Sequence, residues 1–443
     1  MVIILAFLAI LLISTFIGLP VKYPLIFILG SIVFSISFFN TDLALIILIF
    51  SMLLSPEYAI GEVTGRAVVV RADDVFLIVV FLGWIAKMAI KKELGLLKTT
   101  PLNIPIFLYI ITCLISSFIG IMEGRLKAAH VAFYVLKYVE YFLLFFMVSN
   151  NLRTTKQAKK FVAFLLLTCF LVCVYALTQT PLGGRVTAPF EGEGGEPNTF
   201  AGYLLLMTAI IIAFILYPET EHKTIALIVL CCMAFLSFLL TLSRGGWLSF
   251  LPMLATFIIL DRRARLPLLL ALIVGVVLLP LMAPHAVHKR VKDTFAYRWK
   301  TYRVFGNEIS VDKSVAARID SWGVGFQRWK SRPILGYGVP AGVVIDNQYT
   351  RVLNETGVVG LTFFAWILIV VFRTAKRVYS MAEDNNFARA VSLGFMAGFI
   401  GLLAQSASAA VFVIIRIMEP FWFLAAIIVV LEEMLAGRRG AAP

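Results

Sequence analysis

Long apolar runs recur along the whole of this 443-residue chain, and they constrain its fold more than any other feature. Most are about 16 to 20 residues long, which is enough for an α-helix to cross the hydrocarbon core of a bilayer. Hydrophobic residues make up 61% of the sequence, whereas a soluble domain contains roughly half. The mean hydropathy of +0.95 points the same way. The sequence therefore predicts an all-α polytopic membrane protein.

We expect about 14 transmembrane helices, within a range of 12 to 14, because one run is short. The first run has no basic segment before it and no small-residue cleavage site after it, so we expect a retained span rather than a signal peptide. The predicted spans are 2–19, 24–39, 42–54, 74–90, 104–121, 131–148, 161–179, 199–217, 224–242, 245–260, 266–283, 357–373, 388–408 and 420–436.

Lysine and arginine residues gather in alternate connectors, and connectors of this kind face the cytoplasm. This pattern predicts a multi-pass protein with both termini in the cytoplasm. The stretch from residue 284 to residue 360 then lies on the outer, extracytoplasmic side. The basic connectors are residues 91–98, 153–160, 222–223, 262–265, 373–389 and 438–439.

The outer stretch 284–360 is the one long polar segment between predicted spans. A loop of this length usually serves a function or is disordered, and its many aromatic residues argue against disorder. We expect it to fold as a helical cap over a site at the level of the membrane. The chain then divides into an N-terminal helix bundle (1–283), the cap (284–356) and C-terminal transmembrane helices (357–443).

Several arginines lie on the predicted outer side, where the positive-inside rule disfavours them. The planar guanidinium group suits phosphate, so we predict an anionic ligand for this face. Arg244 follows Ser243 in a tight Gly-Gly turn between two spans, close to the membrane plane. It is either an interfacial anchor or a ligand of pyrophosphate, and we favour the second. The outer arginines are Arg66, Arg71, Arg125, Arg185, Arg244, Arg318, Arg351 and Arg416.

The segment from Arg185 to Asn198 is rich in glycine, which is typical of a turn that approaches a ligand closely. Asn198 stands just before an apolar run and is a candidate N-cap of the next helix. In the functional interpretation, Arg185 holds a lipid phosphate while Glu196 and Asn198 bind sugar hydroxyls. The alternative is a connecting loop that ends in a helix cap.

The end of the cap contains Asp346-Asn347-x-Tyr349 and then Glu355. An acidic side chain that faces arginines beside the membrane can act as a general base on a sugar hydroxyl. We assign this role to Asp346 and substrate contacts to the other three. Two structural alternatives remain open: Asp346 caps the following helix, and Glu355 pairs with Arg351 at i,i+4.

Weaker signals lie near two other spans. Arg71, Asp73 and Asp74 precede the fourth span, where the acids are either helix caps or a second acid–base candidate; we include Arg71 and Asp74 among the substrate-binding candidates. Lys137 and Glu140 lie inside the sixth span at i,i+3 and are expected to neutralise each other.

The cysteines and histidines do not form a metal-binding pattern. All five cysteines lie inside apolar runs, and the four histidines are scattered. We interpret the cysteines as small buried hydrophobic side chains and expect neither a metal site nor a cofactor. Neither a P-loop nor a dinucleotide-binding fingerprint occurs in the chain.

Taken together, these motifs resemble the O-antigen ligase and O-antigen polymerase (Wzy-like) superfamily of GT-C membrane glycosyltransferases. The resemblance covers roughly residues 60–410. It rests on Arg185 with Glu196-Pro197-Asn198, on Ser243-Arg244-Gly245, and on the cap series Arg318, Trp322, Arg332-Pro333-x-x-Gly336-x-Gly338, Asp346-Asn347-x-Tyr349 and Glu355-x-Gly357-x-x-Gly360.

The resemblance implies that Arg185 and Arg244 bind the pyrophosphate of a polyprenyl-linked glycan without a divalent metal. Ligases carry a histidine before the asparagine of the cap motif, whereas this chain has Asp346. We therefore predict a polymerase of O-antigen, capsule or exopolysaccharide repeat units at the periplasmic face of a bacterial inner membrane, with Ser243 and Arg318 among its substrate contacts. Its donor and acceptor are polyprenyl-pyrophosphate-linked glycans in the membrane lipid; a chain-length regulator protein is a possible partner, and nucleic acid is not.

Two alternatives remain beside the polymerase. One is an O-antigen ligase that transfers the glycan to lipid A-core. The other is a flippase for lipid-linked oligosaccharides. Such a protein would also have many spans and would also bind a pyrophosphate lipid. A flippase is expected to show two related halves and short loops. The halves of this chain do not match, and its charges gather beneath the long outer loop.

Overall fold

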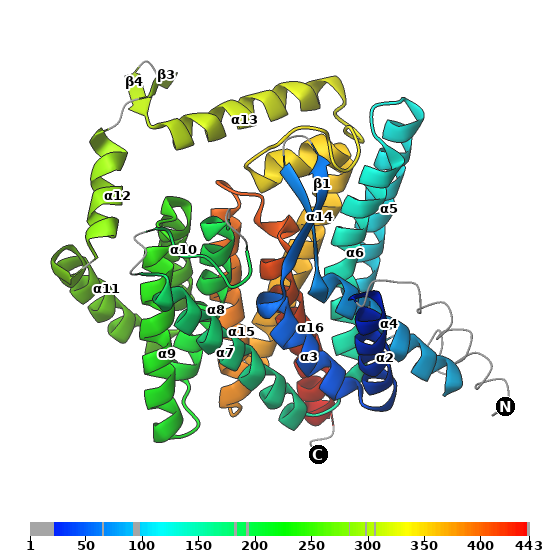
Figure 1. Cartoon of the computed structure of the whole chain (residues 1–443). Coiled ribbons are helices and arrows are strands. Elements are labelled where there is room, and N and C mark those ends of the chain that lie inside the picture. Colours follow the sequence, from blue (N-terminus) through cyan, green and yellow to red (C-terminus); the bar gives the residue numbers. More distant parts are fainter. Residues whose placement is uncertain are drawn as a thin grey trace.

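A computed structural model describes residues 22–63, 66–91, 98–180, 184–191, 195–282, 284–296, 299–304 and 307–440. Helices dominate these residues (Figure 1). Their bounds are α2 (Lys22–Phe39), α3 (Thr41–Leu54), α4 (Ala72–Ile90), α5 (Asn103–Met122), α6 (Ala128–Asn151), α7 (Thr155–Thr178), α8 (Pro197–Leu216), α9 (Glu221–Leu240), α10 (Arg244–Leu260), α11 (Arg262–Met282), α12 (His285–Ala296), α13 (Lys313–Ser331), α14 (Gln348–Met381), α15 (Asn386–Gln405) and α16 (Ile415–Gly440).

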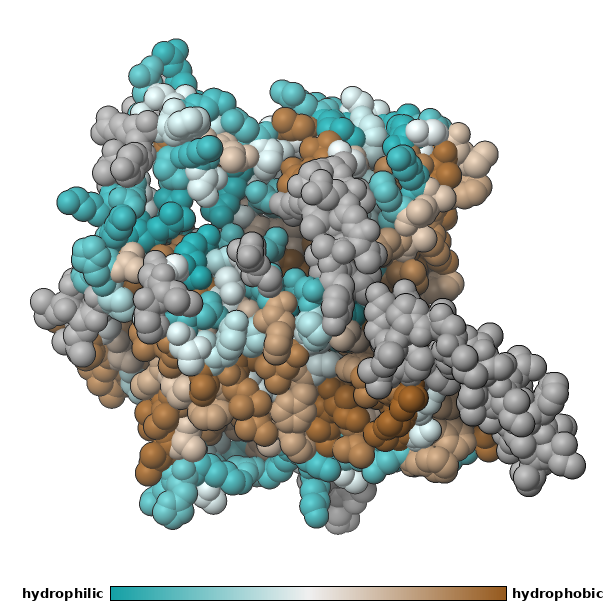
Figure 2. Space-filling view, in the orientation of Figure 1, coloured by the Kyte–Doolittle hydropathy of each residue, from teal (hydrophilic) through white to brown (hydrophobic). Residues whose placement is uncertain are grey.

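The prediction of an all-α polytopic membrane protein is confirmed. Helices α2 to α11 and α14 to α16 coincide with the predicted spans from 24–39 to 420–436, while the span 2–19 lies outside the described residues. By length and composition, eight helices within the described ranges can cross a membrane: α5 to α9 and α14 to α16. On the face that Figure 2 shows, a hydrophobic band lies between two hydrophilic ends.

Helices α8, α15 and α16 form the centre of the bundle, and most of their side chains are buried. Small residues bring α15 close to α8. A Cβ atom at Gly394 would lie 2.8 Å from the Ala209 carbonyl oxygen, and one at Gly398 would lie 2.8 Å from the Leu206 side chain. Close backbone approach through small residues is a common basis of helix association in membranes. Inside the bilayer the hydrophobic effect does not drive helices together, because the lipid tails are as apolar as the side chains.

The predicted helical cap consists of α12 and α13, which Figure 1 shows rising beside the bundle and lying across its end. The sequence analysis missed the antiparallel hairpin between them, which pairs β3 (Lys300–Val304) with β4 (Asn307–Val311). It also missed a second hairpin, between β1 (Glu57–Val63) and β2 (Arg66–Arg71). Both hairpins are too short for the run-length criterion that located the helices.

A Pro-Gly elbow near the end of the cap, formed by Pro333, Gly336 and Gly338, docks onto a kink in α14. The kink is at Gly357, where φ is +65° and a Cβ would collide with the backbone of Ile334 and Leu335. Val358 N donates a hydrogen bond to Pro333 O at 2.8 Å, and Gly338 N donates one to Glu355 O at 2.9 Å. Only glycine allows both this conformation and this approach. The elbow therefore sets where the cap ends and the membrane helix begins.

Candidate functional site

Four arginines gather beneath the cap, and two of them come from cap helices. Arg290 lies on α12 and Arg318 on α13, while Arg185 lies in the loop before α8. Burial lowers the pKa of Arg185 to about 10, and the positive charges of the other arginines contribute to this shift. The same causes, burial and then Arg244, lower the pKa of Arg290. Crowded guanidinium groups destabilise one another unless an anion joins them, so this cluster is suited to a polyanion.

Arg185 is held by the ends of two helices. Its Nε donates to Thr241 O at 2.8 Å, and one terminal nitrogen donates to Asn198 Oδ1 at 3.1 Å. Asn198 Oδ1 also accepts a hydrogen bond from Ser243 Oγ at 2.8 Å. Arg185, Asn198 and Ser243 were all predicted as site residues, and the structure brings them into contact.

The interpretation of Asn198 as the N-cap of α8 is wrong. The helix begins at Pro197, and Glu196 occupies the N-cap position. Proline has a fixed φ and lacks an N–H, so it is favoured in the first turn of a helix. Glu196 is engaged locally, since its Oε2 accepts a hydrogen bond from Thr199 Oγ1 at 3.0 Å.

Arg244 begins α10, whose N-cap is Ser243. Its two terminal nitrogens donate to the two carboxylate oxygens of Asp312, at 2.5 and 2.9 Å, and one of them also donates to Thr294 Oγ1 at 3.2 Å. Asp312 is the N-cap of α13, because its Oδ1 also accepts from Ser314 N at 2.8 Å. The hydrogen bond from Arg244 is the main cause that lowers the pKa of Asp312 to about 2. The cap is thus tied directly to Arg244.

Asp346 lies next to this cluster, in the loop that leads to α14. Burial lowers the pKa of Arg318, and the negative charge of Asp346 partly offsets this shift. The backbone oxygen of Asp346 accepts a hydrogen bond from Trp322 Nε1 at 3.3 Å. The alternative that Asp346 caps α14 is wrong, because Asn347 is the N-cap and accepts from Thr350 N at 2.9 Å.

The three other predicted residues around Asp346 have structural partners. Asn347 Nδ2 donates to Ala407 O at 3.0 Å, and the Tyr349 hydroxyl donates to Leu403 O at 2.7 Å. These bonds anchor the loop to the end of α15. Glu355 is 2% exposed; its carboxylate accepts from Arg351 Nε at 2.8 Å and from Tyr138 Oη at 2.7 Å. The predicted i,i+4 pair between Arg351 and Glu355 is confirmed.

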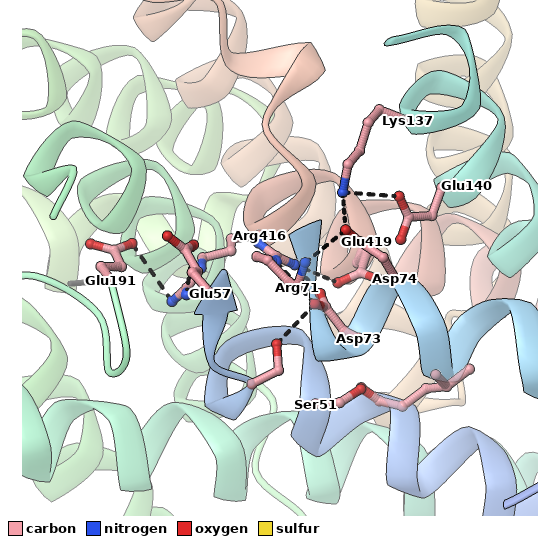
Figure 3. Close-up of polar contacts among 12 residues, drawn as sticks. Ser51, Glu57, Arg71, Asp73, Asp74, Lys137, Glu140, Glu191, Arg416 and Glu419 are labelled. Carbon is pink, nitrogen blue, oxygen red and sulfur yellow. Dashed lines mark hydrogen bonds and ion pairs between the residues drawn. The ribbon is translucent and has the colours of Figure 1, made fainter. Parts of the chain in front are cut away.

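Arg71 and Asp74 belong to a different, buried ionic cluster. Figure 3 shows Arg71 beside Asp73 and Glu419, and Lys137 between Asp74 and Glu140. Lys137 Nζ lies 3.7 Å from Glu140 Oε2, which confirms their predicted pairing. Arg71 N donates to Asp74 Oδ2 at 2.9 Å, so Asp74 also stabilises the first turn of α4.

The sequence analysis missed several residues of these clusters. It gave no role to Arg290, Thr294 or Asp312, although an aspartate two residues before a serine and a helical run is a recognisable cap signal. It also missed Glu57 and Glu191, which flank Arg416 at 2.9 and 3.6 Å (Figure 3). Nothing in the local sequence indicates that Arg416 would meet residues more than 200 positions away.

Among the described residues, no group of three or more His, Cys, Asp or Glu side chains is placed to hold a metal ion. Residues 227–365 match the family model Wzy_C, described as O-antigen ligase. The matched region runs from α9 to α14 and includes Arg244, Asp312, Arg318 and Asp346. No curated protein matches the chain. This integral membrane protein therefore carries, over residues 227–365, the domain of the O-antigen ligase and polymerase superfamily.

Proposed function

We propose that this protein is a polymerase of polyprenyl-pyrophosphate-linked oligosaccharide repeat units, such as those of an O-antigen, a capsule or an exopolysaccharide. It acts at the outer face of a bacterial inner membrane, with both termini in the cytoplasm. The observation that carries the proposal is the convergence of Arg185, Arg244, Arg290 and Arg318 beside Asp346, beneath a cap at one end of the helix bundle.

The reaction exchanges one bond for another. A hydroxyl oxygen of the acceptor sugar bonds to the anomeric carbon of the donor, and the bond from that carbon to the pyrophosphate oxygen breaks. Polyprenyl pyrophosphate leaves with the electron pair, and the hydroxyl proton passes to a base. Because negative charge grows on the leaving group, preplaced cations stabilise the transition state more than the bound substrate. No metal ion is required in this scheme.

The arginines serve the leaving group in two ways. Arg185 is exposed, so it is open to a ligand, and its positive charge adds to those of Arg244, Arg290 and Arg318. The buried Nε of Arg290 has no hydrogen-bond acceptor among the described residues, and a phosphate oxygen would supply one. Arg244 is already oriented by Asp312, so its guanidinium group is held in place before a ligand binds. These donors suit the bidentate binding of phosphate.

Asp346 is our candidate for the base. Its position next to Arg318 keeps a carboxylate close to the arginine cluster, and Asn347 and Tyr349 hold its loop against α15. A positioned carboxylate accepts the proton of the sugar hydroxyl as the hydroxyl attacks. Arg318 then supports both the base and the leaving group.

A ligase is the second candidate, since the family model carries that description. The same arginines would hold the same donor, and the acceptor would be lipid A-core. The presence of Asp346, where the ligases that this chain resembles have a histidine, favours the polymerase.

The test is a transfer assay with purified protein and polyprenyl-pyrophosphate-linked repeat units from the native host. Wild type is expected to produce a glycan ladder, and Arg244→Ala and Asp346→Asn are expected to lose at least about 100-fold in rate. Arg303→Ala is the matched control, because Arg303 is an exposed arginine of the cap hairpin outside the cluster. Transfer only when lipid A-core is supplied would establish a ligase. Movement of the lipid across liposomes without any transfer would overturn both enzymatic functions.

A further inference from the structure

A cavity of about 330 Å³ lies next to Arg244 and Arg290, on the cap side of the cluster. This volume is at the small end of the range for ligand pockets, and it suits a group of the size of one or two sugar rings. Charged side chains, one aromatic ring and one hydroxyl line the cavity. Its lining residues are Arg244, Arg290, Asp293, Trp299, Asp312, Lys313 and Ser314.

Trp299 is fixed in place although its ring is open to solvent. Its backbone N–H donates to Val311 O at 2.8 Å, at the base of the β3–β4 hairpin. The Lys313 ammonium group lies 5.4 Å from the centre of the ring, a cation–π contact that restrains the indole. The residue is still 66% exposed, so much of the ring surface remains available to a ligand.

The usual reason for an exposed tryptophan in a membrane protein is anchoring at the lipid–water interface. That explanation does not suit Trp299. Figure 1 places the β3–β4 hairpin at the far end of the molecule, and Figure 2 shows that this end is hydrophilic and well separated from the hydrophobic band. The neighbours of Trp299 in the cavity are charged or hydroxyl-bearing side chains.

An aromatic ring beside a carboxylate, a hydroxyl and guanidinium groups matches the chemistry of a pyranose. The C–H bonds on one face of a sugar ring are attracted to the negative face of the indole, and the hydroxyls at its edge need hydrogen-bond partners. Asp293 and Ser314 can provide such partners from α12 and α13. Because Arg244 lines the same cavity, a sugar placed there is directly next to the site proposed for pyrophosphate.

We infer that Trp299 is the stacking platform for the sugar that is linked to the pyrophosphate of the donor, with Asp293 and Ser314 as its hydroxyl partners. This inference rests on the proposed function, since it assumes that the arginine cluster binds the pyrophosphate. It assigns a role in glycan recognition to a residue of the cap hairpin. The platform then holds the anomeric carbon at a defined distance from the arginines.

The test compares the binding of two ligands to the full-length protein in nanodiscs. One is a short-chain prenyl pyrophosphate, and the other is the same lipid carrying the repeat-unit glycan of the host. The ratio of the two dissociation constants isolates the contribution of the sugar. In wild type the glycan is expected to tighten binding. Trp299→Ala should reduce that gain in affinity about tenfold, which is comparable to the loss when an aromatic side chain that stacks on a nucleic-acid base is removed. Trp299→Phe should keep part of it.

Two variants serve as controls. Arg244→Ala should weaken the binding of both ligands by the same factor, so the ratio of their dissociation constants should stay at its wild-type value. Phe326→Ala removes another exposed aromatic side chain of the cap, one that does not line this cavity, and should change neither constant. If Trp299→Ala keeps the full gain in affinity from the glycan, the assignment of Trp299 as the stacking platform is wrong, while the proposed pyrophosphate site is unaffected. If wild type binds neither ligand, the proposed function fails as well.

Discussion

The guanidinium of Arg244 and the carboxylate of Asp312 form a two-pronged ion pair, with N–O distances of 2.5 and 2.9 Å. The two residues come from different parts of the protein. Arg244 begins the membrane helix α10, whereas Asp312 is the N-cap residue of α13, a helix of the cap. A fork of this kind fixes the plane of the guanidinium as well as its position. The cap therefore orients the arginine that we propose to hold the leaving group.

Asp312→Asn is expected to slow glycan transfer by about 10- to 100-fold. Asparagine is as good an N-cap as aspartate, so α13 should stay in place while the charge that orients Arg244 is lost. The measurement is the single-turnover rate of transfer. Asp320→Asn is the matched control, because Asp320 forms an exposed ion pair with Lys300 in the cap, away from Arg244. Equal rates for Asp312→Asn and wild type would show that Arg244 does not depend on this pair.

Arg351→Ala is expected to destabilise the protein by about 3–5 kcal/mol, because it leaves the buried Glu355 carboxylate without its cation. Thermal unfolding in detergent measures the loss. The double variant Arg351→Ala with Glu355→Gln should recover most of the stability, since the buried charge is then absent. If Glu355 binds substrate instead, the double variant will be stable but inactive; full activity would mark the pair as structural.

Gly394→Leu is expected to disrupt the packing of α15 against α8 and to cost about 1–3 kcal/mol or more, because a side chain there would meet the α8 backbone. The matched control is Gly275→Leu on α11, where a Cβ would meet no atom within 4 Å. The yield of folded protein after size-exclusion chromatography and the unfolding temperature check both variants. Similar behaviour of the two would contradict the close packing of α8 and α15.

Glu191 is expected to make stability depend on pH. Burial raises its pKa to about 7, although Arg416 opposes the shift. An unfolded glutamate has a pKa near 4.3, so between about pH 4.5 and pH 7 the folded state holds a proton that the unfolded state has lost. The contribution of Glu191 is therefore fully present below pH 4.5 and is lost as pH rises through 7. Unfolding temperatures of wild type and Glu191→Gln, measured from pH 4.5 to pH 8, should diverge over this window. Parallel curves would show that Glu191 does not titrate there.

The sequence by itself determined the membrane helices, the existence of a folded cap and three arginines of the cluster beneath it, Arg185, Arg244 and Arg318. Each of these follows from a local property: the length of an apolar run, the aromatic content of a long loop, or charge where the positive-inside rule disfavours it. The pairs Lys137–Glu140 and Arg351–Glu355 were predictable for the same reason, because helical spacing alone brings them together.

Only the tertiary structure decided which charges distant in sequence meet. Arg244 and Asp312 are 68 positions apart, and Arg416 and Glu57 are 359 apart. The structure also placed Arg71 and Asp74 in a buried cluster with Glu419 (Figure 3). Such contacts depend on how helices pack and how the cap folds back over them, and no local pattern encodes that arrangement. The physical reason is that a helix is specified by its own residues, whereas the partner of a charge is specified by the packing of elements distant in sequence.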